Sequence, residues 1–210
     1  MYITYTIIAI TCLVSLLVMN DPAQKNKLMF NAYSISRRNE WYRFITCGLI
    51  HADFMHLLFN MYSLYSIGMA VEISFKKTEY FGHEKGMLFY ILLYIGGLIM
   101  SEVYSFFTHK DNMHYNSLGA SGAVCSVIFS FVLLYPTAQL NIFFIPLPGW
   151  IFGILFLAIS WVLARRSVGF IAHDAHFWGA VWGFLFPIVL KPDLWYAFLG
   201  NLKMGLMYHS

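Results

Sequence analysis

The stretch from Leu118 to Tyr135 reads LGASGAVCSVIFSFVLLY and contains no charged residue. It opens with small residues and continues with bulky apolar ones. A helix crosses the hydrocarbon core of a bilayer, about 30 Å thick, with about 20 mostly apolar residues. The stretch comes close to that length, so it is predicted to be a membrane-crossing helix with a serine near its amino end.

Five other apolar stretches of similar length lie on either side of it. They run approximately from Tyr2 to Met19, Met55 to Phe75, Met87 to Phe107, Pro146 to Ala164, and Ala172 to Leu190. Apolar residues make up 60% of the 210 residues and charged residues 11%, against about 25% charged in an average soluble domain. The sequence therefore predicts an all-α polytopic membrane protein, with six transmembrane helices in a single domain over 1–210. The first stretch lacks a basic leading region and a cleavage site, so we expect a retained helix rather than a signal peptide.

The longest connection, about 20–53, is too polar to cross a membrane. It nevertheless contains four residues suited to the headgroup region, Trp41, Tyr42, Phe44 and Ile45. We expect this loop to be structured and partly embedded. The remaining connections are shorter, at 76–86, 108–117, 136–145 and 165–171. A short amphipathic tail, about 193–210, is expected to lie along the membrane surface.

The distribution of basic residues sets an expectation for orientation. The side of the long first loop carries Lys25, Lys27, Arg37, Arg38, Arg43, Lys110, Arg165 and Arg166. The other side carries Lys76, Lys77, Lys85, Lys191 and Lys203. The positive-inside rule therefore slightly favours a cytoplasmic first loop. The formal net charge of +3 indicates no particular partner, and no basic stripe with interleaved aromatic residues points to nucleic acid.

Several other classes of site and function find little support. Cys12, Cys47 and Cys125 are scattered and form no CxxC pair, so neither a disulfide framework nor a zinc site is expected. The eight histidines include no His-Glu-x-x-His pattern, which argues against a metal-dependent membrane enzyme. No internal repeat and no pair of broken helices in matching halves is found, which argues against a small transporter.

Strongly polar side chains within membrane-crossing segments are costly and mark function by default. His56 and Asn60 are four residues apart and therefore share one face of a helix. His176 shares a face with Gly179 and Gly183, and glycines at this spacing let another helix approach closely. The sequence therefore predicts one polar face on the second helix and a small-residue face carrying a histidine on the last.

Ser121 lies between Gly119 and Gly122, on a second surface of small residues. If the two small-residue surfaces pack together, Ser121 and His176 come within hydrogen-bond reach, as a serine nucleophile requires. The amino end of a helix favours a developing negative charge. His56 and Asn60 supply further donors to that charge. The constellation predicts acyl transfer.

Other interpretations of these residues stay open at this point. A Gly-Ala-Ser-Gly run in a membrane helix is most often a packing motif. A single intramembrane histidine is equally a packing residue or part of a proton path, and His56 with Asn60 is also compatible with an interhelical hydrogen-bond pair. A nucleophile elbow would require a strand before Ser121, and none is expected there. Glu72, near a helix end, is assigned a structural role.

Taken together, the segments resemble the rhomboid family of intramembrane serine proteases over the whole chain. The family's second-helix signature, two histidines followed by an asparagine, is matched by His51, His56 and Asn60. Its nucleophile motif is matched by Gly119-Ala-Ser121-Gly122, and its last-helix motif by His176, Gly179 and Gly183. Its loop arginine is matched by Arg43, eight residues before His51, and its glutamate by Glu72, after a Gly-Met-Ala-Val run.

The resemblance implies a six-helix rhomboid-like bundle with a Ser121–His176 dyad and no third acidic member. It implies an oxyanion hole from the Ser121 N–H, His56 and Asn60, beside Gly119. Structural support is implied for Arg43, His51, Glu72, Gly122, Gly179 and Gly183. The substrate would be a transmembrane segment of another protein, whose helix must open before a serine can reach its carbonyls.

The resemblance also sets the expected surroundings of the protein. It implies a multi-pass protein of the lipid bilayer, in the bacterial cytoplasmic (inner) membrane, with no metal and no organic cofactor. The fifth helix, from Pro146 onward, would be the lateral gate for substrates. The oligomeric state stays open.

The sequence departs from the family pattern in three respects. Cys125 stands where the family usually has an aromatic residue that stacks on the catalytic histidine. Tyr42 stands where tryptophan is usual in the loop motif. The family's orientation, with the first loop outside the cytoplasm, is opposite to that favoured by the charge count. A non-proteolytic rhomboid-like scaffold is the main rival function, although such proteins generally lack the serine or the histidine.

Overall fold

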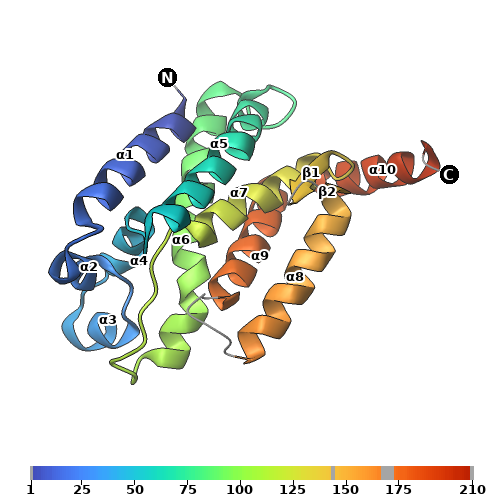
Figure 1. Ribbon diagram of the computed structural model, residues 1–210. Helices are drawn as coiled ribbons and strands as arrows, with labels where there is room; N and C mark the ends of the chain where they lie inside the picture. The colour runs from blue at the N-terminus through green and yellow to red at the C-terminus, as the bar shows by residue number, and fades with distance from the viewer. Residues whose placement is uncertain (1, 143–144, 167–172, 209–210) are drawn as a thin grey trace.

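The computed structural model describes residues 2–142, 145–166 and 173–208, which form a bundle composed mainly of α-helices (Figure 1). Helices α5 (Phe54–Lys76) and α6 (His83–His109) are long and apolar enough to cross a membrane. The shorter apolar helices are α1 (Ile3–Val18), α7 (Ser121–Leu134) and the Gly149–Ala164 part of α8 (Gly149–Arg166). The predicted polytopic helical character is thus confirmed, with two helices of full membrane length.

Helix α7 lies at the centre of the bundle, in contact with α5, α6 and α9 (His173–Leu190) (Figure 1). Nearly all of its side chains are buried. Two serines in its interior donate their hydroxyls to backbone carbonyls: Ser126 donates to Ala123 O at 2.7 Å, and Ser130 donates to Gly183 O of α9 at 2.6 Å. A helix with small and apolar residues on all sides can be packed against neighbours all round, which accounts for its central place.

Helices α7 and α9 pack backbone to backbone through glycines. A Cβ atom added to Gly179 would overlap the Gly122 carbonyl, and one added to Gly183 would overlap the Ser126 backbone. Small residues at this spacing let helix backbones approach more closely than side chains would permit. The close approach predicted from the glycine spacing is therefore confirmed.

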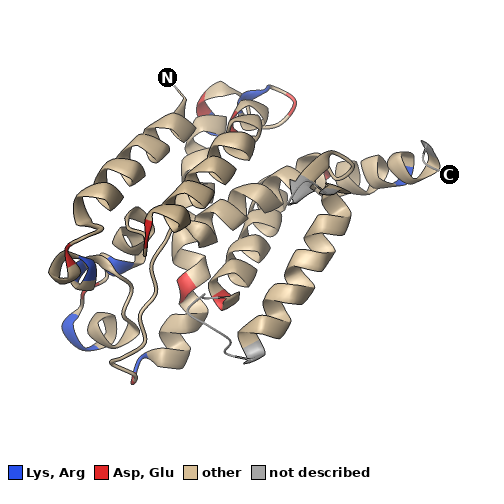
Figure 2. Cartoon of the chain, viewed as in Figure 1, with Lys and Arg blue, Asp and Glu red and all other residues tan. Residues whose placement is uncertain are grey.

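The first connection is structured, as predicted. It contains three short helices, α2 (Pro22–Leu28), α3 (Ala32–Arg38) and α4 (Arg43–Thr46), and a 3-10 turn, η1 (Cys47–Leu49). Paired hydrogen bonds between Phe30 and Ser117, at 2.9 and 3.1 Å, tie the loop to the segment before α7. Figure 2 shows basic residues gathered on α2 and α3, and few charges along the middle of α1, α7 and α8.

The region before α8 differs from the sequence prediction. Strands β1 (Gln139–Ile142) and β2 (Ile145–Pro148) pair as an antiparallel hairpin, and α8 (Gly149–Arg166) begins only after it. The predicted helix start at Pro146 is therefore wrong, and the mainly helical bundle includes this one short hairpin among the described residues. Two prolines in the segment IPLP explain the difference, because proline favours extended backbone in the residue before it and removes an N–H donor.

The segments before and after the last predicted span have boundaries that differ from the prediction or lie outside the described residues. The connection predicted at 165–171 is shorter at its start, because α8 continues to Arg166. Residues 167–172, with the predicted start of the last span at Ala172, lie outside the described residues. The predicted tail is a helix, α10 (Asp193–Tyr208), which contacts α7 and α9 and buries Leu194 before it projects from the bundle (Figure 1).

Candidate active site

Ser121 and His176 form a hydrogen bond, with 2.7 Å between Ser121 Oγ and His176 Nε2. Ser121 is the first residue of α7, and His176 lies in the first turn of α9. The glycine contact between Gly122 and Gly179 lies beside this pair and sets the separation of the two helices. The structure thus brings together two residues that are 55 positions apart in the sequence.

The turn that leads into Ser121 depends on Gly119. Its φ of +118° lies in a region that side chains rarely adopt. A Cβ at this position would lie 2.6 Å from Cε1 and 2.8 Å from Nε2 of His56. Glycine is therefore required both by the backbone conformation and by the His56 ring that lies over it.

The backbone N–H groups before Ser121 have partners outside α7. The first N–H groups of a helix have no intrahelical partner, and the N-cap residue, Ala120, offers no side-chain acceptor. The Gly119 N–H donates to Cys47 O at 2.9 Å, and the Ala120 N–H donates to His51 Nε2 at 3.2 Å. The backbone N–H of the following residue, Ser121, lies beside the hydroxyl of the same residue.

His56 and Asn60 lie on one face of α5, as their spacing predicts. The Asp53 carboxylate caps the helix by accepting from the His56 N–H at 2.8 Å. The His56 Nδ1 accepts from the Ala52 N–H at 3.5 Å, an arrangement that leaves the proton on Nε2, the nitrogen nearest Gly119. The Asn60 side chain donates one N–H to His56 O at 2.9 Å, so its second amide hydrogen is available to another acceptor.

His51 holds the turn before the serine in place. Because its Nε2 accepts from the Ala120 N–H, its Nδ1 carries the proton and donates to Ser15 Oγ at 2.9 Å. The Ser15 hydroxyl in turn donates to Leu49 O at 2.8 Å. This chain of hydrogen bonds joins α1, η1 and the start of α7, and the His51 ring is fully buried.

Arg43 and Glu72 lie apart from the serine and the histidine. The Arg43 guanidinium donates to Asn26 O and Met29 O, at 2.8 and 2.7 Å, and pairs with Glu40 at 2.6 Å, so it braces the first loop. The Glu72 carboxylate is fully buried. Its partners are the N–H groups of Ile3 and Thr4, at 2.9 and 2.8 Å, the Thr4 hydroxyl, and Lys76. Glu72 therefore caps the amino end of α1.

Sequence reasoning overlooked a second polar cluster, between α6 and the start of α9. The Ser117 hydroxyl donates to Glu102 Oε1 at 2.7 Å, and the Ser105 hydroxyl donates to Asp174 Oδ2 at 2.6 Å. Tyr115, in the loop between α6 and α7, donates to Ser105 at 3.1 Å. Burial and the nearby Glu102 and Asp174 carboxylates raise the pKa of Tyr115. An ionisable residue within the apolar stretch 87–107 was the signal that could have identified Glu102.

Within the described ranges, no group of three His, Cys, Asp or Glu side chains is arranged to hold a metal ion. The chemistry that the site offers comes from a hydroxyl, an imidazole and several N–H donors. A hydroxyl that can give its proton to an imidazole, beside N–H donors at a helix terminus, has the geometry for nucleophilic attack on a carbonyl.

The rhomboid domain family model matches residues 38–193, which include Ser121, His176, His56 and Asn60. The chain belongs to the rhomboid family. Among its relatives, the rhomboid protease GluP of Bacillus subtilis is 29% identical over 99% of this chain and 40% of its own length. The rhomboid protease AarA of Providencia stuartii is 26% identical over 58% of this chain and 44% of its own length.

A mitochondrial RHOMBOID-like protein 12 of Arabidopsis thaliana is 27% identical over 73% of this chain and 49% of its own length. The chain thus spans about half or less of the length of these curated relatives. Rhomboid proteins are integral membrane proteins, and the family includes proteases of bacteria. Membership therefore assigns this chain to a family of membrane-embedded hydrolases.

Proposed function

We propose that the protein is an intramembrane serine endopeptidase that cleaves transmembrane segments of other membrane proteins. Ser121 is the nucleophile and His176 is its general base. The single observation that carries the proposal is the 2.7 Å hydrogen bond between Ser121 Oγ and His176 Nε2 at the start of two closely packed helices. Family membership and the protease relatives support the same reaction class.

The reaction follows from the positions of the two side chains. As Ser121 Oγ attacks the scissile carbonyl carbon, its proton passes to His176 Nε2, and the carbonyl oxygen becomes an oxyanion. The protonated imidazole then gives the proton to the leaving amine, and the peptide C–N bond breaks. Water, deprotonated by the same nitrogen, hydrolyses the acyl-enzyme and restores the serine.

The oxyanion would be bound by N–H donors that are already oriented before the reaction. These are the Ser121 N–H, His56 Nε2, which lies over Gly119, and the second amide hydrogen of Asn60. Donors that are fixed in place stabilise the charge without reorganising during the reaction, and each is typically worth about 3 kcal/mol. Arg43 and Glu72 act on this site through the loop and the helices that they hold. His51 also contacts the His56 ring directly, with ring centroids 4.9 Å apart.

The proposed topology has six membrane spans in one domain, formed by α1, α5, α6, α7, α8 and α9. Helices shorter than the bilayer core are accommodated where neighbours surround them, as α7 is surrounded here. Substrates would enter laterally past α8, which lies at the edge of the bundle (Figure 1). A bacterial cytoplasmic membrane is the proposed location, supported by the two bacterial protease relatives.

The test is cleavage of a single-span membrane substrate in liposomes, by the unmodified protein and by Ser121→Ala. We expect cleavage by the first and none by the second, together with labelling of the unmodified protein alone by a fluorophosphonate probe. His176→Ala should abolish both activities while the protein stays folded. A folded protein that neither cleaves nor reacts with the probe would instead favour the non-proteolytic scaffold.

A further inference from the structure

The His176 ring has aromatic neighbours in addition to its hydrogen bond to Ser121. Two rings lie against it: His173, with centroids 6.1 Å apart, and Phe156 of α8, with centroids 6.4 Å apart and planes tilted by 39°. Aromatic rings interact favourably at centroid separations of about 4.5–7 Å, so both can fix the orientation of the imidazole.

Phe156 reaches His176 because α7 carries a small residue at this level. Cys125 forms a buried cluster with Phe129 and Ala180, and Phe156 packs against that cluster. The Phe156 ring lies 5.5 Å from the Phe129 ring. The aromatic contact to the histidine thus comes from α8, and not from the helix that carries the serine.

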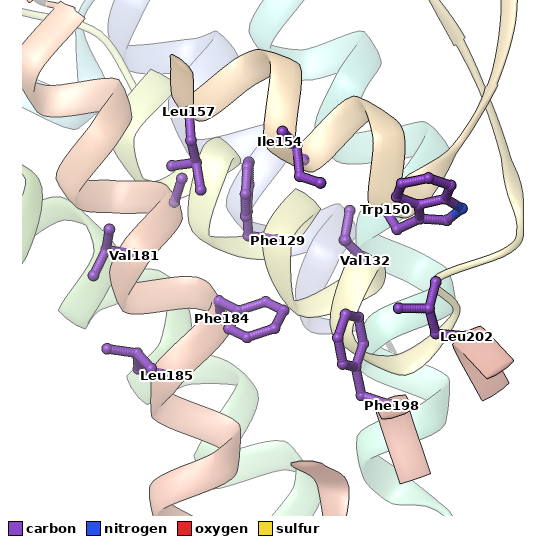
Figure 3. A pocket seen from close by; sticks show the side chains of 12 residues that line it. Phe129, Val132, Trp150, Ile154, Leu157, Val181, Phe184, Leu185, Phe198 and Leu202 are labelled. Atoms are coloured by element: carbon purple, nitrogen blue, oxygen red, sulfur yellow. The ribbon is translucent and has the colours of Figure 1, made fainter. Parts of the chain in front are cut away.

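One side of α8 borders an open groove. The groove, of about 390 Å³, lies between α8, α9 and α10 (Figure 3), and its lining side chains include Trp150, Ile154, Phe184 and Phe198. Ile154 is exposed in this groove, and Leu155, Ile159 and Val162 are exposed elsewhere on α8. Side chains that border a groove make fewer packing contacts with the protein than side chains in a filled core, so α8 can shift at lower cost than a fully packed helix. A shift of α8 moves Phe156 with it.

We propose that Phe156 is a positioning residue for His176, so that the orientation of the base depends on the position of α8. The inference rests on the proposed protease function. It assigns to α8 a role in the chemical step in addition to any role in substrate entry. Because Phe156 contacts the base and not the Ser121 oxygen, its removal affects the rate constant of the reaction rather than substrate affinity.

Four variants test the inference. Phe156→Leu removes the ring but retains bulk, and Phe156→Tyr retains the ring. Phe152→Leu is the matched control: Phe152 lies one turn away on α8, 5.5 Å from the Phe156 ring, and packs on the same cluster. The fourth variant, Cys125→Phe combined with Phe156→Ala, moves the aromatic ring from α8 to α7. For each, kcat and KM are measured in liposomes, fluorophosphonate labelling of Ser121 is timed, and folding is checked by thermal unfolding.

We expect Phe156→Leu to lower kcat and the labelling rate by about 3- to 10-fold with KM unchanged. Phe156→Tyr and Phe152→Leu should keep the original rate. The double variant Cys125→Phe with Phe156→Ala (the exchange variant) should recover most of that rate. The inference is overturned if Phe156→Leu retains full kcat, if Phe152→Leu lowers it equally, or if a folded exchange variant stays as slow as Phe156→Leu. An unmodified protein that neither cleaves nor reacts with the probe would refute the proposed function itself, a result distinct from all of these.

Discussion

Substituting Gly179 by alanine tests the packing that brings the two reacting residues together. The added Cβ would lie 2.9 Å from the carbonyl carbon and 3.0 Å from the Cα of Gly122, whereas carbon atoms in contact are normally about 3.5–4.0 Å apart. The Gly122 carbonyl oxygen would lie closer still, so helices α7 and α9 must separate by about 1 Å beside the Ser121–His176 pair. That displacement stretches the 2.7 Å hydrogen bond beyond the range of a good one, about 3.2 Å.

We expect Gly179→Ala to lower kcat by about 100-fold, because a misplacement of about 1 Å has an effect of that size. The cost in stability should be about 1–3 kcal/mol, as for an overpacked core. The assay is cleavage of a single-span substrate in liposomes, with thermal unfolding in detergent measured alongside.

Gly153→Ala is the matched control for this prediction. A Cβ at that position of α8 would meet Val132 and Phe129 at 3.5 and 3.6 Å, which are ordinary contacts. Its activity should be close to that of the unmodified protein. If Gly179→Ala cleaved as fast as Gly153→Ala, the backbone approach of α7 and α9 would not be what aligns the two residues, and this reasoning would be refuted.

Two further predictions concern residues on α5. Asn60→Ala should lower the cleavage rate by about 100-fold with little change in substrate affinity, if its amide stabilises the oxyanion; an unchanged rate would make it a structural residue. Glu72→Gln should destabilise the protein by about 3 kcal/mol in thermal unfolding, because it weakens buried charged hydrogen bonds to the start of α1. Since Glu72 lies about 24 Å along the helix from His56, each folded molecule should still cleave at the original rate, and a loss of activity without a loss of stability would contradict this.

The sequence by itself determined the apolar helices and the faces that carry the site. The predicted stretch 55–75 became α5 within a residue at each end, because a long apolar run is a local property that tertiary contacts do not need to supply. The spacing of His176, Gly179 and Gly183 likewise indicated a close helix contact, since helical periodicity alone places them on one face. Motif spacing therefore sufficed to name the pair that the structure brings within 2.7 Å.

Tertiary structure alone decided which side chains meet across the bundle. The hydrogen bonds of His51 to Ser15 and to the Ala120 N–H join three separate parts of the chain. The contact of Phe156 with His176 likewise depends on the distance between α8 and α9. Sequence periodicity does not predict such contacts between side chains, because they depend on how the helices are placed relative to one another. The local sequence pattern determines which side chains lie on each face of a helix. The packing of all the helices determines which of those side chains come into contact.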